Sequence, residues 1–462
     1  RLFRMSEISA IDLVDTAISL AEILNPKINA IVYQDFDRAM ATAKSLDKQA
    51  NRASMSPLAG VPFLIKDNNL FEAGVPTTFG SRTAKGHVPT TDSDLVSLWK
   101  KAGLVSLGRS NTPEFATAFT TEPKAYGKTR NPWNLAHTTG GSSGGAAAAV
   151  AAGIVPAAHG NDAGGSIRIP SSCCSLFGLR PTQNLVSVQP HFREVWNGVN
   201  SEHVLTRSVR DSALFLDIAT QNASWAYSRA ARSSPGRLRI GVSNQSIMGG
   251  AVSPQVLNEL ERTITLLKEL GHDVVEYQLP ITAADVQCLV LIAAAGACKM
   301  HEDICATLGE SARPGDLEAF NQGLFALAKS SSAVDFLAAT DHMNRVRKIM
   351  HDMFDHIDVF MSPTLAQEPL ELGVLDTDAD NFDIEIFLKK SFDFSPFTAP
   401  FNIAGLPAMS VPLGISPAGL PIGVQFGAMH HAEARLFSLA GQIETVRPWM
   451  HKNTEMMKNQ LS

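Results

Sequence analysis

The sequence predicts an α/β protein whose central sheet is mostly parallel. From residue 92 onward a helical pattern, a short apolar strand and a loop follow one another, which is the alternation typical of this fold class. Residues 61–65 form a strand too apolar to alternate, as expected for a strand that is covered on both faces. The length of 462 residues suits two to four domains or one large single-sheet α/β protein.

The composition is ordinary for a globular chain, with 45% hydrophobic residues, 18% charged residues and a net charge of −6. This mildly acidic balance argues against binding to nucleic acid or to an anionic membrane, because both need clustered Lys and Arg. No uninterrupted apolar run reaches the roughly 18 residues of a membrane helix. The strongest candidate, residues 146–158, is broken by Pro156. We therefore expect no nucleic-acid partner and no membrane partner, and we leave a homodimer open.

The five cysteines form neither a CxxC pair nor the framework of a secreted domain. Reduced, buried thiols in a cytoplasmic protein are the expected state. The histidines give no HExxH motif, and His430-His431 has no carboxylate or cysteine pattern nearby. We expect neither a metal nor a cofactor.

The N-terminal residues 1–56 are predicted to form a helical layer. Ser9 is expected to cap a helix over residues 10–24 that has one apolar stripe and ends at Asn25-Pro26. A second helix is predicted over residues 35–53, which are polar and rich in alanine.

The strand at residues 61–65 stops at Lys66, and this lysine has two interpretations. It could extend from the end of the strand to water, which is the more common behaviour of a strand-end lysine. Alternatively it is desolvated and neutral near pH 7, because burial disfavours the charged form.

The remaining elements follow from apolar periodicity and from Gly/Pro punctuation. We divide the chain into a core at 57–232, a variable region at 233–355 that is expected to form pocket walls, and a return to the sheet at 356–462. Helices are predicted over residues 93–102, 146–152, 254–270 and 432–446, over a segment that follows 206–211 and runs to 219, and over most of 281–355 with an interruption at 313–315. Strands are predicted at 104–107, 238–242, 272–277 and 357–361, and two more within 397–425.

Residues 138–182 contain two glycine–serine clusters, Gly140–Gly145 (GGSSGG) and Gly164–Ser166 (GGS), joined by an alanine-rich segment. One such cluster would be a set of tight turns. Two clusters, separated by a packed helix, point to a site at which hydroxyl and main-chain N–H groups converge.

Three known serine or phosphate motifs do not explain these clusters. G-x-S-x-G fits around Ser142 or Ser143, but a loop precedes it where a nucleophile elbow needs a strand. S-x-x-K occurs twice, beginning at Ser45 and at Ser97, both on predicted surface helices and without the companion motifs. No phosphate-binding G-x-x-x-x-G-K-[ST] is present.

Longer motifs identify a family. The chain resembles the amidase signature family in GVPFLIKDN (60–68), TRNPWN (129–134), GGSSGG (140–145), GNDAGGSIRIP (160–170), GLRPT (178–182), and FTAPFNIAGLPAMSVPLG with GLPIGVQ (397–425). The resemblance covers nearly the whole chain, and it implies a single α/β/α domain, residues 1–462, around a large mixed sheet. The wording around His159 is similar to that of aminohexanoate cyclic-dimer hydrolases.

The resemblance implies a Ser-Ser-Lys triad. Ser166 would be the nucleophile, Ser142 the bridging serine after a cis peptide bond, and Lys66 the base. The backbone N–H groups of Ala163, Gly164, Gly165 and Ser166 would form the oxyanion hole. This chemistry is coherent because serine is a weak nucleophile that needs a proton acceptor within hydrogen-bond reach.

Three neighbouring residues have supporting or structural interpretations. Ser143 either hydrogen-bonds Lys66 or is simply a turn residue. Asp162 and Arg168 flank the nucleophile, and we expect them to pair with each other and brace the loop. The chain departs from the family at Asn161, where many members carry threonine.

The sequence thus predicts an amidase that hydrolyses small carboxamides or linear or cyclic amides through an acyl-enzyme. Its partner would be a small-molecule amide. One alternative is the glutaminase component of a tRNA-dependent amidotransferase, which would work within an obligate complex. The other alternative is a catalytically silent scaffold, although the presence of all three triad residues speaks against it.

Overall fold

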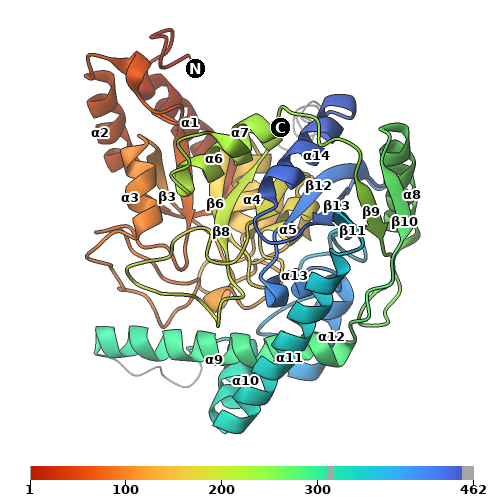
Figure 1. The fold of residues 1–462 in the computed structure, drawn as a ribbon. Coiled ribbons are helices and arrows are strands. Elements are labelled where there is room, and N and C mark those ends of the chain that lie inside the picture. Colours follow the sequence, from red (N-terminus) through yellow and green to blue (C-terminus); the bar gives the residue numbers. More distant parts are fainter. Residues whose placement is uncertain (1, 310–315, 450–462) are drawn as a thin grey trace.

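The computed structural model describes residues 2–309 and 316–449 and shows a central sheet covered by helices on both faces (Figure 1). The described strands form an 11-stranded sheet in the order β1-β3-β2-β6-β8-β7-β12-β13-β11-β9-β10, with a separate two-stranded sheet, β4-β5. Their bounds are β1 Ile31–Gln34, β2 Pro62–Lys66, β3 Val105–Ser110, β4 Arg130–Asn131, β5 Asn134–Thr138, β6 Ala157–Asn161, β7 Phe177–Arg180, β8 Glu202–Thr206, β9 Arg239–Val242, β10 Asp273–Glu276, β11 Val359–Pro363, β12 Ala408–Ile415 and β13 Pro421–Gly427.

The sheet is mixed, as the family resemblance implies, but it is not mostly parallel. Among the described strands, only the pairs β2-β3, β2-β6, β9-β10 and β9-β11 run parallel. The strands from β6 through β8, β7, β12 and β13 to β11 pair antiparallel, as do β1 and β3. The prediction was wrong here because it extended the early helix–strand alternation to the C-terminal strands, whereas β12 and β13 are joined directly by the short loop that an antiparallel pair permits.

Two layers of helices bury the sheet. The first layer includes α4 and α5, which pack on one face of the central strands. The second layer, on the other face, includes α3, α6, α8 and α14. Each layer forms an apolar core with its face of the sheet, and strand β2 contributes to both cores. Leu64 belongs to the first core, and its neighbours Phe63 and Ile65 belong to the second. The helices are α1 Ala10–Ile28, α2 Phe36–Asp47, α3 Asp94–Lys101, α4 Gly144–Ala151, α5 Arg168–Cys173, α6 Val209–Ala219, α7 Ala226–Ala230, α8 Pro254–Glu269 and α14 Glu433–Val446.

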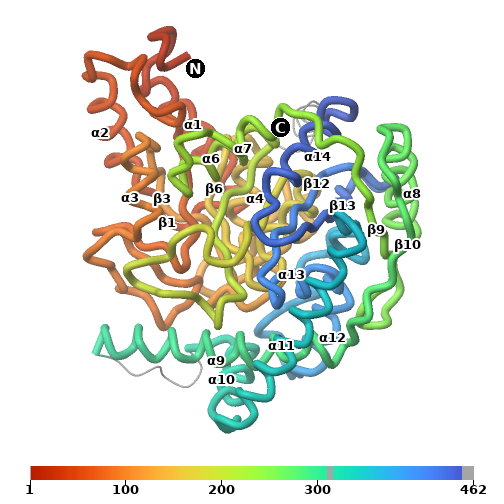
Figure 2. The backbone as a smooth tube through the Cα atoms, viewed as in Figure 1, coloured from red at the N-terminus to blue at the C-terminus, as the bar shows by residue number. Residues whose placement is uncertain are grey.

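A third group of helices packs together at one end of the sheet, with α9, α10, α11 and α12 at the bottom of Figures 1 and 2 and α13 above them, against α11. The expected interruption at 313–315 falls outside the described residues. Helix α9 is long and apolar enough to cross a membrane by length and composition alone, although charged residues interrupt its apolar sequence. Half of its most apolar window is buried inside the protein, and it packs on α10 and α11 as a core helix does. The helices of this group are α9 Ala283–Leu308, α10 Ala319–Ser330, α11 Ala333–Met353, α12 Ile384–Phe394 and α13 Ala399–Ala404.

The N-terminal helices differ from the prediction at their ends. Ser9 caps α1 through a reciprocal capping box, but the helix continues through Pro26 and ends where Asn29 adopts a left-handed conformation. Helix α2 ends at Asp47, short of residue 53, and only a 3₁₀ turn follows. The Asp47 carboxylate accepts the N–H groups of Ala10 and Ile11, so the end of α2 supplies acceptors for the first turn of α1.

Candidate active site

Lys66, the last residue of β2, has no exposed surface. The interpretation of a lysine that extends to water is therefore wrong. Burial lowers the pKa of Lys66 to about 7, although the charges of Glu202 and Asp162 act in the opposite direction. The side chain thus exchanges between its neutral and protonated forms near neutral pH.

Three polar groups surround the Lys66 amine. Its Nζ lies 2.7 Å from Ser142 Oγ, 3.0 Å from Ser143 Oγ and 2.5 Å from Asn161 Oδ1. The two serines precede α4, and Asn161 ends β6. The peptide bond between Gly141 and Ser142 is cis. The predicted contact between Ser143 and Lys66 is thus present.

The two glycine–serine clusters meet at this point. The N–H of Ser143 donates to the carbonyl oxygen of Ser166 at 3.3 Å. The first cluster lies close against other main chain, because a Cβ on Gly141 would stand 2.2 Å from the carbonyl oxygen of Thr120. In the second, Gly165 has a φ of +128°, a value that residues with side chains rarely adopt. These glycines explain why both clusters need this residue type.

Ser166 lines a pocket together with Ala163 and Gly164. The pocket has an empty volume of about 590 Å³, including its opening to solvent. Its walls come mainly from α9, α10 and α12 and from two aromatic residues in loops, and no Lys, Arg, Asp, Glu or His is among the described residues that line it. The wall residues are Ala116, Thr117, Phe119, Trp196, Leu289, Val290, Ala293, Phe320, Leu324, Phe387, Leu388, Ser391 and Phe392.

The pocket walls were predicted only in part. Helices α9 and α10 lie in the variable region that was expected to supply them. Helix α12 lies in the segment that we interpreted as a return to the sheet, so its contribution was missed. The sequence does carry a signal for it, because Asp383 is a good N-cap residue and its side chain accepts the N–H groups of Glu385 and Ile386.

The backbone N–H groups near Ser166 divide into two kinds. Those of Ala163, Gly164 and Ser166, the same residues that line the pocket, make no hydrogen bond within residues 2–309 and 316–449. Gly165, which was expected to be a fourth oxyanion donor, differs: its N–H donates to Asp162 Oδ1 at 2.8 Å. Three N–H groups are therefore free to receive a ligand oxygen.

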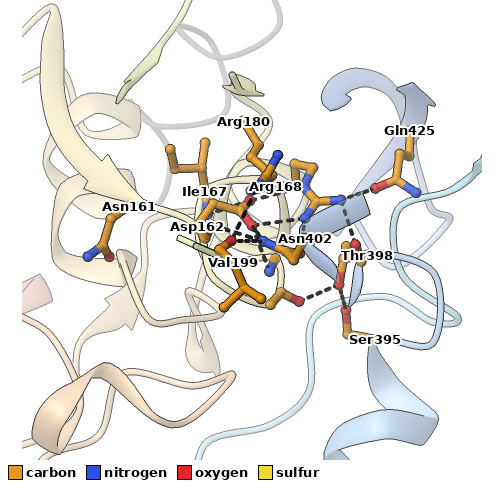
Figure 3. A network of polar contacts seen from close by, with 12 residues as sticks. Asn161, Asp162, Ile167, Arg168, Arg180, Val199, Ser395, Thr398, Asn402 and Gln425 are labelled. Carbon is orange, nitrogen blue, oxygen red and sulfur yellow. Dashed lines mark hydrogen bonds and ion pairs between the residues drawn. The ribbon is translucent and has the colours of Figure 1, made fainter. Parts of the chain in front are cut away.

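Asp162 and Arg168 brace this loop, as expected. Their closest contact, Arg168 Nη2 to Asp162 Oδ1, measures 2.8 Å, and neither side chain is exposed. Figure 3 shows Arg168 also reaching Asn402 and Gln425, at 2.6 Å each. Burial alone would raise the pKa of Asp162, but Arg168 holds it well below its usual range. Thr398 completes the brace by donating to the carbonyl oxygen of Gly164 at 2.6 Å.

Sequence reasoning missed three residues that surround Lys66. Asn161 was noted only as a departure from the family, yet it makes the shortest contact with Nζ. His159 accepts the main-chain N–H of Lys66 at Nδ1, 3.3 Å away, and its Nε2 lies 2.8 Å from Glu202 Oε2. The available signal was the departure from the family at Asn161, close to the second glycine cluster.

An α/β sheet protein with a buried lysine beside paired serines, and with free N–H groups in an apolar pocket, has the features of a serine-dependent hydrolase. Comparison with known proteins identifies the family. The family model described as Amidase matches residues 12–437. The chain therefore belongs to the amidase family, whose members act on amide C–N bonds.

Individual relatives agree with this assignment. The chain is 33% identical to the 6-aminohexanoate-cyclic-dimer hydrolase of Paenarthrobacter ureafaciens, over 99% of this chain and 95% of that protein. The solved structure of a 6-aminohexanoate cyclic dimer hydrolase complexed with substrate superimposes with a TM-score of 0.92 at 32% identity, covering 99% and 97% of the two chains.

The amidotransferase alternative is less well supported. The solved glutamyl-tRNA(Gln) amidotransferase component from Thermotoga maritima matches with a TM-score of 0.75 at 27% identity, covering 95% of this chain and 92% of that one. Both values are lower than those of the hydrolase, so this alternative is not favoured.

Proposed function

We propose that the protein hydrolyses neutral amides through an acyl-enzyme on Ser166, with Ser142 relaying protons to Lys66. The observation that carries this proposal is the wholly buried Lys66 amine, 2.7 Å from Ser142 Oγ. A serine hydroxyl needs a base within hydrogen-bond reach, and a lysine whose pKa is about 7 can serve as that base at neutral pH.

The hydrogen bonds around Lys66 support the direction of the relay. Ser143 donates its hydroxyl hydrogen to the carbonyl oxygen of Asn161, and Asn161 Oδ1 can only accept. A neutral Lys66 therefore directs its two N–H groups to Ser143 Oγ and Asn161 Oδ1. Its lone pair then faces Ser142. Of the three groups in contact with Nζ, only the Ser142 hydroxyl can donate a proton to it.

The reaction follows from this arrangement. Ser166 Oγ attacks the carbonyl carbon while its proton passes to Ser142 and the proton of Ser142 passes to Lys66. The oxyanion that forms accepts hydrogen bonds from the N–H groups of Ala163, Gly164 and Ser166, where one donor is worth about 2.7–4 kcal/mol. The C–N bond then breaks as the proton returns through Ser142 to the leaving nitrogen. Water repeats the sequence to release the acid, and the scheme needs no metal or cofactor.

The pocket supports a neutral, largely apolar substrate. Within the part of the chain that the structure describes, no ionisable side chain lines it, so a charged acyl group would lose its hydration without gaining a partner. The cyclic dimer named for the relatives fits this class, because its amide nitrogens and carbonyl groups carry no charge. Free glutamine does not fit it, because its α-amino and α-carboxylate groups are both ionised. The five cysteines are free thiols, which supports a cytoplasmic setting.

The assignment can be tested by labelling with a fluorophosphonate and mapping the modified peptide by mass spectrometry. We expect the label on Ser166 and its loss in Ser166→Ala. Ser97→Ala, which changes a serine of the rejected S-x-x-K motif, should label as the wild type does. Labelling that survives Ser166→Ala would contradict the assignment. A panel of neutral and charged amides, with glutamine included, would test the substrate class.

A further inference from the structure

A buried polar cluster lies behind Lys66, and the proposed reaction does not use it. His159 and Glu202 both have no exposed surface, and His159 Nε2 lies 2.8 Å from Glu202 Oε2. Asn200 Nδ2 donates to the other carboxylate oxygen, Glu202 Oε1, at 2.7 Å. His159 Nδ1 joins the cluster to Lys66 through the main-chain N–H of the lysine.

The protonation state of His159 follows from these contacts. A backbone N–H can only donate, so His159 Nδ1 must be the unprotonated nitrogen of the ring. Nε2 then carries the hydrogen and donates it to Glu202. The imidazole is therefore neutral. Burial also lowers the pKa of His159, which favours the same neutral form.

Glu202 is a carboxylate by the same reasoning. Its two oxygens accept from His159 and from Asn200, and neither partner offers an acceptor for a carboxylic O–H. A neutral histidine does not compensate the negative charge. Within residues 2–309 and 316–449, no Lys or Arg lies within ion-pair distance of Glu202.

The other charged groups near Lys66 have cationic or main-chain partners of their own. Asp162 pairs with Arg168 at 2.8 Å. Asp67, the next residue along the chain, accepts from the main chain and hydroxyl of Thr78. Arg109 donates to the carbonyl oxygens of Leu70 and, at 3.5 Å, Lys66. Of the two carboxylates that raise the pKa of Lys66, Asp162 is thus paired with a cation, whereas Glu202 contacts only a neutral imidazole and an amide.

Glu202 is also close to the lysine amine. It stands directly opposite Asn161 in the antiparallel pair β6-β8, and opposite residues in such a pair lie about 4.5–5.5 Å apart at Cα. Asn161 Oδ1 in turn contacts Lys66 Nζ. Among the charged groups, Glu202 raises the pKa of Lys66 most strongly, ahead of Asp162.

We propose that Glu202, held by the neutral imidazole of His159, is a positioning residue that acts as the buried counter-charge for the ammonium form of Lys66. The proposal rests on Lys66 as the proton acceptor. When Lys66 takes the proton of Ser142, a positive charge appears on a side chain that has no exposed surface. Glu202 offsets that charge, while burial lowers the pKa of Lys66 far enough for the neutral form to be available near pH 7.

The first experiment measures the protonation of Lys66 without using catalysis. Protein labelled with ¹³C at the lysine Cε would be titrated by NMR, with the Lys66 signal assigned by its absence in Lys66→Met. In Glu202→Gln we expect the Lys66 pKa to fall by about one unit, because the charge is removed while the shape is kept. Glu202→Asp, which retains the charge, should restore most of the difference. An unchanged Lys66 pKa in Glu202→Gln would overturn the proposal.

A matched control comes from Asp217, another buried carboxylate, whose oxygens accept the N–H groups of Tyr227 and Ser228 away from the pocket. Asp217→Asn should leave the Lys66 titration where it is in the wild type. If Glu202→Gln does not fold, ¹⁵N NMR of wild-type His159 still decides. A neutral ring with hydrogen on Nε2 supports the proposal, and an imidazolium overturns it because Glu202 would then be compensated.

Kinetics separate this proposal from the proposed function. In Glu202→Gln the acid limb of the kcat/KM profile should move to lower pH by the shift measured for Lys66, and kcat at the plateau should fall. A purely structural role would lower the melting temperature and the rate without moving the limb. If Glu202→Gln lowers the pKa of Lys66 but the wild type hydrolyses no amide, the role of Glu202 as counter-charge is supported and the proposed function is contradicted.

Discussion

Two buried basic side chains of the candidate site, Lys66 and Arg168, differ in what surrounds them. Arg168 meets a carboxylate, two side-chain amides and a carbonyl oxygen. Lys66 meets two hydroxyls and one amide oxygen, and none of these is charged. Both side chains are buried, yet of the two only Arg168 has an ion-pair partner in direct contact.

The difference separates a fixed charge from a movable one. A guanidinium stays protonated in proteins, and with Asp162 it forms a pair that holds the loop carrying Ser166. A buried lysine without a carboxylate in contact loses its proton more readily, and burial lowers the pKa of Lys66 to about 7. The direct partner therefore decides whether a buried cation supports the structure or can exchange protons.

Removing the movable charge should have the largest effect on turnover. Lys66→Met is expected to lower kcat for amide hydrolysis by about 10²- to 10⁴-fold, the usual contribution of a positioned general base. Steady-state kinetics on a neutral amide would measure it, with Lys44→Met on an exposed helix position as the control. Near-normal turnover in Lys66→Met would show that Lys66 is not the base.

Removing the fixed charge should act on stability. Arg168→Met leaves Asp162 buried without its ion-pair partner, and we expect the free energy of unfolding to fall by about 3–5 kcal/mol. Urea denaturation would measure the loss. The exposed pair of Arg210 and Asp211 offers a comparison, because Arg210→Met should cost no more than about 1 kcal/mol. Equal losses in the two variants would contradict the comparison.

Giving Lys66 a carboxylate in contact should make it resemble Arg168. The wild type should lose activity as the pH falls through about 7, because the base becomes protonated there. In Asn161→Asp the new charge favours the ammonium form, so the acid limb should move up by about 1–3 pH units. A pH–rate profile tests this, with the exposed Asn244→Asp as the control. A limb that stays in place or moves down would be inconsistent with this account.

The smallest effect is expected at Ser143. Its hydroxyl accepts from Lys66 but gives its own hydrogen to the main chain, so it orients the amine without relaying a proton. Ser143→Ala should cost about 0.5–1.5 kcal/mol of transition-state stabilisation, or roughly 2- to 12-fold in kcat/KM. Ser142→Ala should cost far more. Similar losses in the two variants would remove the distinction between the relay serine and the orienting serine.

Local rules predicted the elements that sequence periodicity determines. The buried strand ending at Lys66 and the helix beginning at Pro254 lie close to where they were predicted, and the small helix predicted over 146–152 begins two residues earlier, at Gly144. The direction of the C-terminal strands could not be obtained in this way, because strand pairing depends on contacts between distant segments. The continuation of α1 through Pro26 likewise reflects its surroundings, since the Asn25 side chain accepts the N–H groups of Ala30 and Ile31 after the helix.

The site shows the same limit. Glycine and serine spacing, with the family resemblance, was enough to name Lys66, Ser142 and Ser166 as candidates. It could not show that Gly165 donates to Asp162, because that bond depends on how the loop turns. Nor could it show Glu202 behind Lys66, because 136 positions in the chain separate two residues that the fold brings together through β6 and β8.

The wall of the pocket has a consequence for how such a protein can diversify. The candidate proton-transfer groups lie between residues 66 and 166, whereas most of the surface that would touch the substrate lies between 289 and 392. The wall residues are uncharged, so exchanging them changes the shape and volume of the pocket without disturbing the charges that set the lysine. A lineage could therefore acquire new amide substrates by drift in α9, α10 and α12 while inheriting its chemistry unchanged.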